Sequence, residues 1–186
     1  MRKISIFAAI LCGCGALVAA EPDYTDGVFI INEDWYGHQN STVNFLRPDA
    51  PDGNYWEYNV FSEVNPGYEL GCTNQFGAIH KGRIYFIAKQ DSDPGSPVAG
   101  GRITVADART MKRLYQSAVI DPSGKQCDGR AFVGIDEHKG YISTSHGIWV
   151  FDLDHYEVKT MVEGSENPHG NAGDNPVNSA GALYHG

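Results

Sequence analysis

The sequence has little that would suggest a helical protein or one of the common enzymes. After residue 20, no stretch places apolar residues at i, i+3 and i+4 over the length of a helix. That part of the chain also lacks the G-x-S-x-G, H-E-x-x-H and C-x-x-C motifs and a phosphate-binding loop. These absences argue against an α-helical fold and against the best-known hydrolase, metalloprotease, redox and nucleotide-binding sites.

Positive charge is scarce as well. The 186 residues include 14 Lys and Arg against 23 Asp and Glu, and the formal net charge is −9. Nucleic acids and anionic lipids attract basic surfaces, so an acidic chain without a basic cluster is poorly suited to bind either. We therefore expect no nucleic-acid partner.

Cysteine is rare, and two of the four cysteines, Cys12 and Cys14, lie in a segment typical of a signal peptide. Residues 1–20 begin with basic residues, continue with an apolar core and end on small residues. Such a segment directs export and is not a transmembrane span. Residues 11–14 also match a lipobox, in which Cys14 would carry a lipid anchor. Cleavage after residue 20 and lipidation at Cys14 both stay open, and both place residues 21–186 in the periplasm or on the outer-membrane surface.

The pattern that dominates the remaining chain is a repeat. Residues 77–86 read GAIHKGRIYF, residues 134–143 read GIDEHKGYIS, and residues 181–186, GALYHG, match the first copy position by position. The run ITVAD at 103–107 corresponds in the same way to IWVFD at 148–152. Self-similarity at such intervals is typical of propellers and other repeat arrays. A single β-sandwich with accidental self-similarity is the alternative.

Each copy reads as four strands, because β-branched and aromatic runs are bounded by Gly, Asn and Asp. We predict an all-β fold, a β-propeller of four-stranded antiparallel blades, with about three blades present in this chain. In each copy the first expected strand ends at a glycine, Gly82 in one copy and Gly140 in the other. The next three strands cover 83–89, 103–107 and 111–120 in the first of these copies. In the second they cover 141–145, 148–152 and 156–162. A diverged first copy at 27–32 and 43–47 lacks its inner strand. The match of 181–186 to an opening strand predicts a chain truncated at its C-terminus.

The repeats also predict local roles. Gly82 and Gly140 suit tight hairpin turns, where glycine supplies positive φ. Asp107 and Asp152 end corresponding strands and should hold the turns that follow by accepting backbone N–H bonds. The apolar residues of these strands, Ile103, Val105, Ile148 and Val150, are expected to pack between sheets.

The two remaining cysteines, Cys72 and Cys127, precede corresponding inner strands. Export permits a disulfide, and neighbouring inner strands would bring the two residues close together. A shift of two residues would separate their Cα atoms beyond the limit of roughly 7 Å for a disulfide. A disulfide and two buried, unpaired thiols therefore both stay open.

At this point the motifs resemble a known family. The pattern of GAIHKGRIY followed by ITVADART is similar to the YVTN or YncE-like β-propellers, and the segments GVFIINEDWYGHQNSTVNF and YELGCTNQFGAI resemble secreted and cell-surface members from Bacteroidetes-type bacteria. The resemblance covers residues 24–186. It implies a ring of typically seven blades, of which this chain would hold about three, and its motifs are specific for the fold and weak for activity. The favoured interpretation is a non-catalytic binding propeller. One branch of the family captures corrinoids and delivers them to a TonB-dependent transporter, although nothing in this sequence selects that branch.

The connections between strands suggest where binding occurs. The links from second to third strands and between blades share one face, and on that face the sequence places long polar loops with aromatic residues. Aromatic side chains there offer amphipathic contact area at a small entropic cost, and Arg130 and Lys89 could pair with an anionic ligand group. Packing of Trp35 between blades and a structural ion pair for Arg130 are the alternatives. The predicted ligand-binding residues are Trp35, Tyr36, His38, Tyr68, Gln90, Arg130, His146 and His169.

Neither a metal nor a cofactor is predicted. Residues 91–95, DSDPG, resemble the start of a calcium loop, but the later ligands are out of register and the segment reads as a solvated turn. The seven histidines show no i, i+2 or i, i+4 pair. The favoured function is capture of a small molecule or docking of a partner, possible partners including an outer-membrane TonB-dependent transporter. A lactonase-like hydrolase and a purely structural interaction module are the alternatives.

Overall fold

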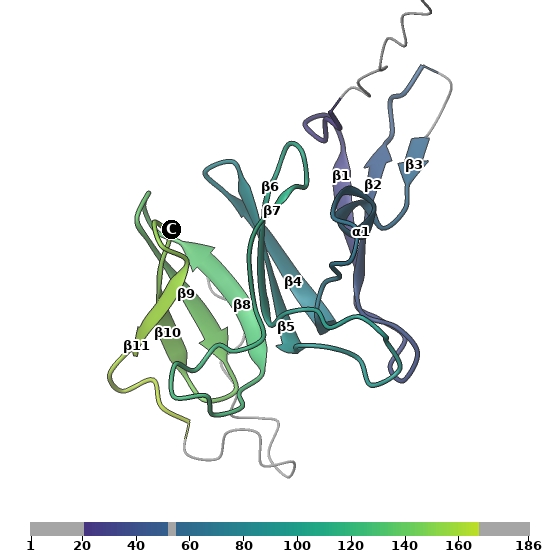
Figure 1. Cartoon of the computed structure of the whole chain (residues 1–186). Helices are drawn as coiled ribbons and strands as arrows, with labels where there is room; N and C mark the ends of the chain where they lie inside the picture. Colours follow the sequence, from purple (N-terminus) through teal and green to yellow (C-terminus); the bar gives the residue numbers. More distant parts are fainter. Residues whose placement is uncertain (1–20, 52–54, 168–186) are drawn as a thin grey trace, which may run out of the picture.

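The computed structural model describes residues 21–51 and 55–167. These residues form three antiparallel β-sheets that lie side by side, which confirms the predicted all-β class (Figure 1). The first sheet contains β1 (Val28–Asn32), β2 (Thr42–Arg47) and β3 (Tyr55–Glu57); the second contains β4 (Cys72–His80), β5 (Arg83–Gln90), β6 (Ile103–Asp107) and β7 (Arg113–Ser117); the third contains β8 (Gly129–Gly134), β9 (Lys139–Thr144), β10 (Ile148–Asp152) and β11 (Glu157–Met161). A short helix, α1 (Val60–Val64), links the first sheet to the second. The expected signal segment and the partial repeat at 181–186 lie outside the described residues.

Within each sheet, every strand pairs with the next one along the chain, as the repeat predicts. The second and third sheets have four strands each, and the first has three within the described residues. The β4–β5 hairpin turns at Lys81 and Gly82, both with positive φ (49° and 74°), as a two-residue hairpin turn with the favoured twist requires. The prediction for Gly140 is wrong, because this residue lies inside β9 opposite Gly134. A Cβ at Gly140 would come within 2.6 Å of the Phe132 ring, so the position needs glycine for packing.

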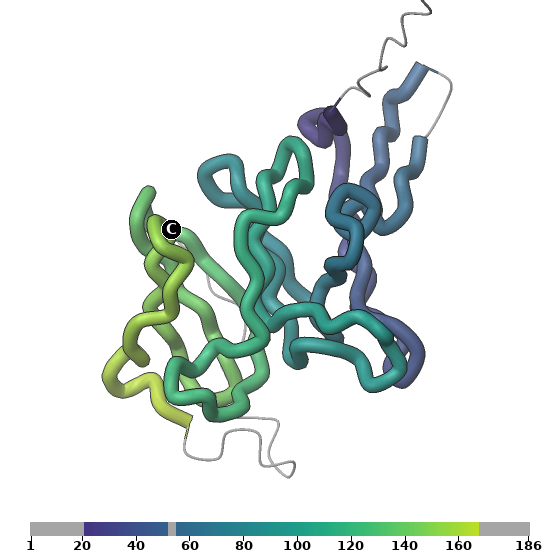
Figure 2. The backbone as a smooth tube through the Cα atoms, in the orientation of Figure 1, coloured from purple at the N-terminus to yellow at the C-terminus, as the bar shows by residue number. Residues whose placement is uncertain are grey.

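The connections alternate between two ends of the sheets. The hairpin end carries the β4–β5, β6–β7 and β8–β9 turns, and the loop end carries the connections 33–41, 91–102, 118–128 and 145–147 (Figure 2). Lys139, where β9 begins, is at the hairpin end, whereas Trp35 is in a connection at the loop end. The predicted topology is therefore confirmed for Trp35, while His169 lies outside the described residues.

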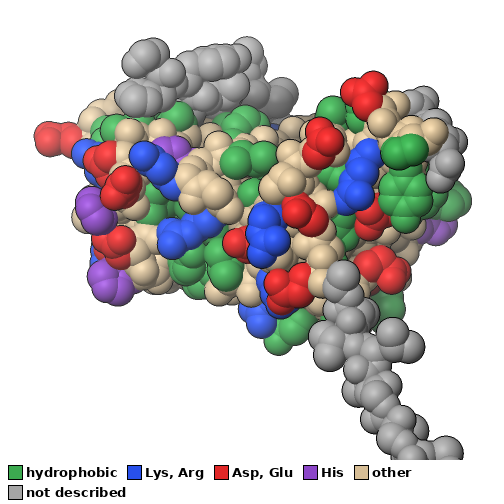
Figure 3. Space-filling model, turned by 90° about the horizontal axis from the view of Figure 1, so that it is seen from above, with side chains coloured by type: hydrophobic (Ala, Val, Ile, Leu, Met, Phe, Trp, Pro, Cys, Tyr) green, Lys and Arg blue, Asp and Glu red, His purple; other side chains and the backbone are tan. Residues whose placement is uncertain are grey.

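The hairpin end is a surface of mixed charge. Acidic and basic side chains are interspersed across it, with most of the visible histidines toward one edge (Figure 3). Several of them form exposed ion pairs, among them Lys81–Glu137 at 3.6 Å and His138–Asp154 at 2.8 Å. No patch of one sign stands out on this face. Within the described residues, no helix has the length and apolar character needed to cross a bilayer.

Two hydrophobic clusters join the sheets, and β5 contributes to both. Tyr85 and Ile87 point into the cluster between the second and third sheets, and Ile84 and Phe86 point into the cluster between the first and second. This alternation follows from the two-residue period of a strand with both faces covered. The second sheet is thus the middle layer of the described structure.

The packing prediction for the repeated strands holds in one copy and fails in the other. Ile103 and Val105 of β6 are fully buried, as predicted. In β10 the buried residues are Trp149 and Phe151, and Ile148 and Val150 are half-buried, so their assignment was wrong. The inner face of β10 is therefore the one that carries its aromatic residues.

The turn prediction is confirmed at both aspartates. Asp107 Oδ1 accepts the backbone N–H groups of Arg109 at 3.0 Å and Thr110 at 2.7 Å. Asp152 Oδ1 accepts those of Asp154 at 2.9 Å and His155 at 3.0 Å. These carboxylates satisfy donors that the tight turn would otherwise leave unpaired.

Candidate functional site

The 33–41 connection displays aromatic side chains at the loop end. Trp35 is 65% exposed and Tyr36 is 62% exposed. The ring of His38 lies against the Trp35 indole, with centroids 4.1 Å apart. A tight turn closes beneath them, because the backbone N–H groups of His38 and Gln39 both donate to Trp35 O. Packing of Trp35 between sheets, the alternative reading from the sequence, is wrong.

The backbone of this connection is firmly attached to the second sheet. Asn40, only 2% exposed, donates from Nδ2 to Val98 O at 2.8 Å and accepts at Oδ1 from the Asp93 N–H at 2.6 Å. Gly37 N donates to Asp93 Oδ2 at 2.7 Å, and Ser41 N donates to Gly71 O at 3.0 Å. The loop therefore presents exposed rings from a fixed backbone.

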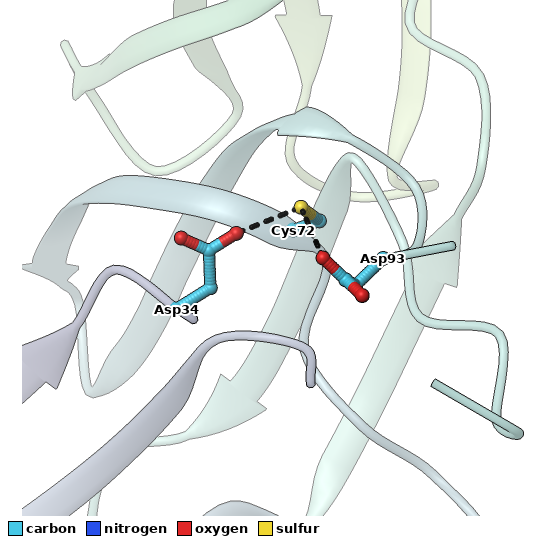
Figure 4. A group of neighbouring side chains, drawn as sticks. All are labelled: Asp34, Cys72 and Asp93. Atoms are coloured by element: carbon cyan, nitrogen blue, oxygen red, sulfur yellow. Dashed lines mark hydrogen bonds between the residues drawn. The ribbon is translucent and has the colours of Figure 1, made fainter. Parts of the chain in front are cut away.

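Residues 33–41 are called the aromatic loop below. Next to this loop, two carboxylates lie close to a thiol. Asp34 comes from the 33–41 connection, Cys72 from the start of β4 and Asp93 from the 91–102 connection (Figure 4). Cys72 Sγ lies 2.8 Å from Asp34 Oδ2 and 3.7 Å from Asp93 Oδ2. One ligand atom from each residue falls within 4.8 Å of the others. We call Asp34, Cys72 and Asp93 the acid–thiol cluster.

The thiol of this cluster is protonated and hydrogen-bonded. Burial, together with the hydrogen bond that it donates to Asp34, raises the pKa of Cys72 to about 12. A nucleophilic cysteine needs a lowered pKa, so Cys72 in this state is not set up for attack. Both Cys72 and Cys127 are buried and unpaired, which decides between the two alternatives that the sequence left open.

The backbone beside the cluster is strained. Thr73 has φ of 55°, a left-handed conformation that β-branched residues rarely adopt. Its N–H donates to Asp34 Oδ2 at 3.2 Å. The pairing of β4 with β5 is irregular just beyond, between Asn74 and Phe76. Strained backbone of this kind is concentrated at functional sites, although strain alone assigns no function.

The other predicted site residues do not form one group. Gln90 ends β5 at the loop end, opposite Cys72, and His146 lies in the 145–147 connection, where burial lowers the pKa of its imidazole. Arg130 is ion-paired with Asp128 at 3.5 Å, which matches its structural alternative. Tyr68 does not join the loop end: its ring packs against the Arg113 guanidinium, 3.7 Å from the centroid. His169 lies outside the described residues.

The burial of Asp93 and Arg102, charged residues at the loop end, was not predicted from the sequence. Asp93 was read as part of a solvated turn, yet it is 2% exposed. Arg102 is 6% exposed and donates to Cys127 O at 2.9 Å, with Asp91 and Asp128 within 4 Å. Both lie in or beside an irregular connection, where no periodic pattern signals burial.

One hollow of about 240 Å³ lies at the loop end, between the 91–102 and 118–128 connections, and is lined in part by Arg102, Lys125 and Cys127. Another of about 750 Å³ lies at the hairpin end, around Asp23 and Arg47, and is remote from the aromatic loop. The second hollow borders residues 52–54, which are outside the described residues, so it contributes nothing to the candidate site.

Comparison with known proteins identifies the family to which this chain belongs. The family model described as "Domain of unknown function (DUF5074)" matches residues 26–181. The chain belongs to the DUF5074 family. No curated protein matches it. The DUF5074 match covers all three sheets, the aromatic loop and the acid–thiol cluster, and its description assigns no activity.

Proposed function

We propose that this DUF5074 chain is a non-catalytic binding protein that captures a small molecule at its loop end. In this proposal the three sheets are blades of a β-propeller, and the protein works in the periplasm or at the outer-membrane surface. A TonB-dependent transporter would then receive the ligand. The signal-like residues 1–20 and the resemblance to surface propellers support the location and the partner.

The observation that carries the proposal is the aromatic loop. Trp35 and Tyr36 are each more than half exposed, yet the backbone beneath them is fixed by Asn40 and Asp93. Exposed aromatic rings on an already ordered backbone can bind with little loss of conformational entropy. A loop needed only to connect β1 and β2 would gain nothing from such rings.

The chemistry at the loop end supports binding in preference to catalysis. Cys72 is protonated and its thiol donates to Asp34, so it is not an activated nucleophile. Arg130 is engaged by Asp128, and Arg102 by Asp91 and Cys127 O. The lactonase-like alternative gains no support from these side chains.

A thermal-shift screen of the full chain against small ring-containing molecules, a corrinoid among them, tests the proposal. We expect at least one compound to raise the melting temperature, and the double variant Trp35→Ala with Tyr36→Ala to lose that shift. Because these side chains are exposed, the ligand-free melting temperature should stay near that of the wild type.

The chain offers a matched control in a second exposed Trp–Tyr pair. Trp56 and Tyr58, 42% and 71% exposed, stack on each other at the outer edge of the first sheet. Their double alanine variant should keep the ligand-induced shift. Loss of the shift in this control, or its retention without Trp35 and Tyr36, would move the binding site away from the aromatic loop.

A further inference from the structure

The acid–thiol cluster combines a buried negative charge with a ligand atom that soft metals prefer. Asp93 is 2% exposed and Cys72 is 0% exposed. Among the described residues, no Lys, Arg or His forms an ion pair with Asp34 or Asp93. Buried charges in proteins are paired with opposite charges or coordinate metals. Asp93 accepts backbone N–H groups from Gly37 and Gly95 and lies against the Cys72 thiol, but these contacts supply no full positive charge.

A second observation lies two residues farther along β4. Asn74 is 1% exposed, and its Nδ2 has no hydrogen-bond partner among the described residues. Both Cys72 and Asn74 contact the 33–41 connection, Cys72 through Asp34 and Asn74 through its backbone N–H to Ser41 Oγ at 2.9 Å. A buried amide nitrogen without a protein acceptor is free to donate to a ligand, so β4 carries a second unsatisfied polar group two residues from Cys72.

We propose that Asp34, Cys72 and Asp93 form a binding site for a Zn²⁺-class divalent cation, with a fourth coordination position open to water. The proposal goes beyond the ligand capture described above and does not depend on it. The ion would join the 33–41 and 91–102 connections to the first residue of β4. It would thereby fix the backbone from which Trp35 and Tyr36 project.

The donor set and its spacing select this class of metal. Thiolate with carboxylate suits Zn²⁺, whereas Ca²⁺ and Mg²⁺ take oxygen ligands only. Zn–S near 2.3 Å and Zn–O near 2.1 Å in a tetrahedron place sulfur and oxygen about 3.6 Å apart. Cys72 Sγ and Asp93 Oδ2 already lie 3.7 Å apart. Asp34 Oδ2 lies closer to the sulfur, 2.8 Å from Cys72 Sγ. Asp34 is half-buried on its connection, and its carboxylate would move outward by about 0.8 Å to reach the separation of the same tetrahedron.

Binding also requires that the thiol lose its proton. A metal ligand must be a thiolate, so Zn²⁺ would replace the proton that Cys72 now shares with Asp34. The S–H bond breaks, a Zn–S bond forms, and the proton leaves to solvent. No oxidant or reductant is needed.

Equilibrium dialysis of the full chain against Zn²⁺, followed by elemental analysis, tests the site. We expect one ion per chain in the wild type. Cys72→Ser should weaken binding by more than about 100-fold, since loss of a hydrogen-bond partner behind a ligand alone costs about 10- to 100-fold. Asp93→Asn should weaken it as well. Cys127→Ser is the matched control: Cys127 is equally buried but lies outside the cluster, so this variant should bind as the wild type does.

Replacement of Zn²⁺ by Co²⁺ supplies a measurement that needs no substitution in the cluster. In a background with Cys12, Cys14 and Cys127 replaced by serine, Cys72 is the one remaining thiol of the chain, so a thiolate-to-cobalt charge-transfer absorption would report its coordination. Absence of this absorption, absence of stoichiometric Zn²⁺ in the wild type, or undiminished Zn²⁺ binding by Cys72→Ser would each overturn the proposal. Stronger retention of Ca²⁺ than of Zn²⁺ would also overturn it.

Discussion

At the scale of single residues, the repeated aspartates illustrate how short-range chemistry shapes this chain. Asp107, Asp136 and Asp152 each accept backbone N–H groups two and three residues ahead. Asp107 and Asp152 hold the corresponding β6–β7 and β10–β11 turns, and Asp136 holds the β8–β9 turn. A carboxylate in this position replaces water as the acceptor and holds the turn closed.

Asp152 gives this motif a measurable pH dependence. The hydrogen bond from the His155 backbone N–H is the largest influence, and it helps to lower the pKa of Asp152 from 3.8 to about 2. Because the folded-state pKa is the lower one, the carboxylate stabilises the fold above about pH 4, and this stabilisation is lost as the pH falls toward 2. Asp152→Asn should therefore flatten the decline in the free energy of unfolding between pH 4 and pH 2, measured by urea titration.

The exposed Asp49 is the control for that experiment, because Asp49→Asn removes the same charge from a residue that holds no such turn. This variant should keep the slope of the wild type. Equal slopes for wild type and Asp152→Asn would show that the turn carboxylate does not control acid stability.

At the scale of elements, the 33–41 connection is ordered by contacts to the second sheet rather than by its own sequence. Asn40 links it to Asp93, Val98 and Glu69 through its buried side chain. The connection between β5 and β6 is held by the same atoms. The two loops therefore form one structural unit, with the acid–thiol cluster at its base.

Asn40→Ala should weaken this unit. It leaves the Asp93 N–H without its acceptor and removes one of the two hydrogen bonds to the Val98 carbonyl, which still accepts from Ser96 Oγ. An unsatisfied buried polar group costs about 1–3 kcal/mol in the free energy of unfolding. Amide hydrogen exchange at Gly37, whose N–H donates to Asp93, should become faster. The neighbouring Gln39, whose side chain is exposed, is the control, and Gln39→Ala should leave both quantities unchanged. Unaltered exchange at Gly37 in Asn40→Ala would mean that the loop is ordered by other contacts.

At the scale of the whole molecule, three sheets share two hydrophobic interfaces. The second sheet is covered on both sides, whereas β10 of the third sheet buries its aromatic face and leaves Ile148 and Val150 half-buried. Side chains at corresponding positions of the repeat therefore contribute unequally to stability. Burial, and not sequence similarity, sets the size of each contribution.

Alanine substitutions at two corresponding positions of the repeat measure this difference in the free energy of unfolding. Ile103→Ala, at a fully buried residue, should lower the free energy of unfolding by about 2–5 kcal/mol. Ile148→Ala, at a half-buried residue, should lower it by about 1–2 kcal/mol because less apolar surface returns to water. Urea denaturation provides both values. Equal losses would indicate that Ile148 is covered in solution to the same degree as Ile103.

The sequence by itself determined the strands of the second and third sheets, β1 and β2 of the first, their order, and the turn aspartates Asp107 and Asp152; it did not predict β3 or α1. These features depend on neighbours within a few residues: alternating β-branched side chains, a glycine with positive φ at 82, and an aspartate beside its own turn. The family resemblance and the aromatic character of residues 35 and 36 could also be seen before the fold was known. Gly140 was misassigned because a glycine that packs under a ring looks the same in sequence as one that turns.

Only the tertiary structure decided which residues meet at the loop end. Asp34, Cys72 and Asp93 come from three separate segments, and only the packing of the first sheet on the second brings them within 4.8 Å. The same packing buries Asp93 in a segment whose composition predicts a solvated turn. Tyr68 packs against Arg113 and does not lie at the loop end. Contacts across sheets depend on long-range geometry that local patterns do not encode, which is why the strands were predictable and the cluster was not.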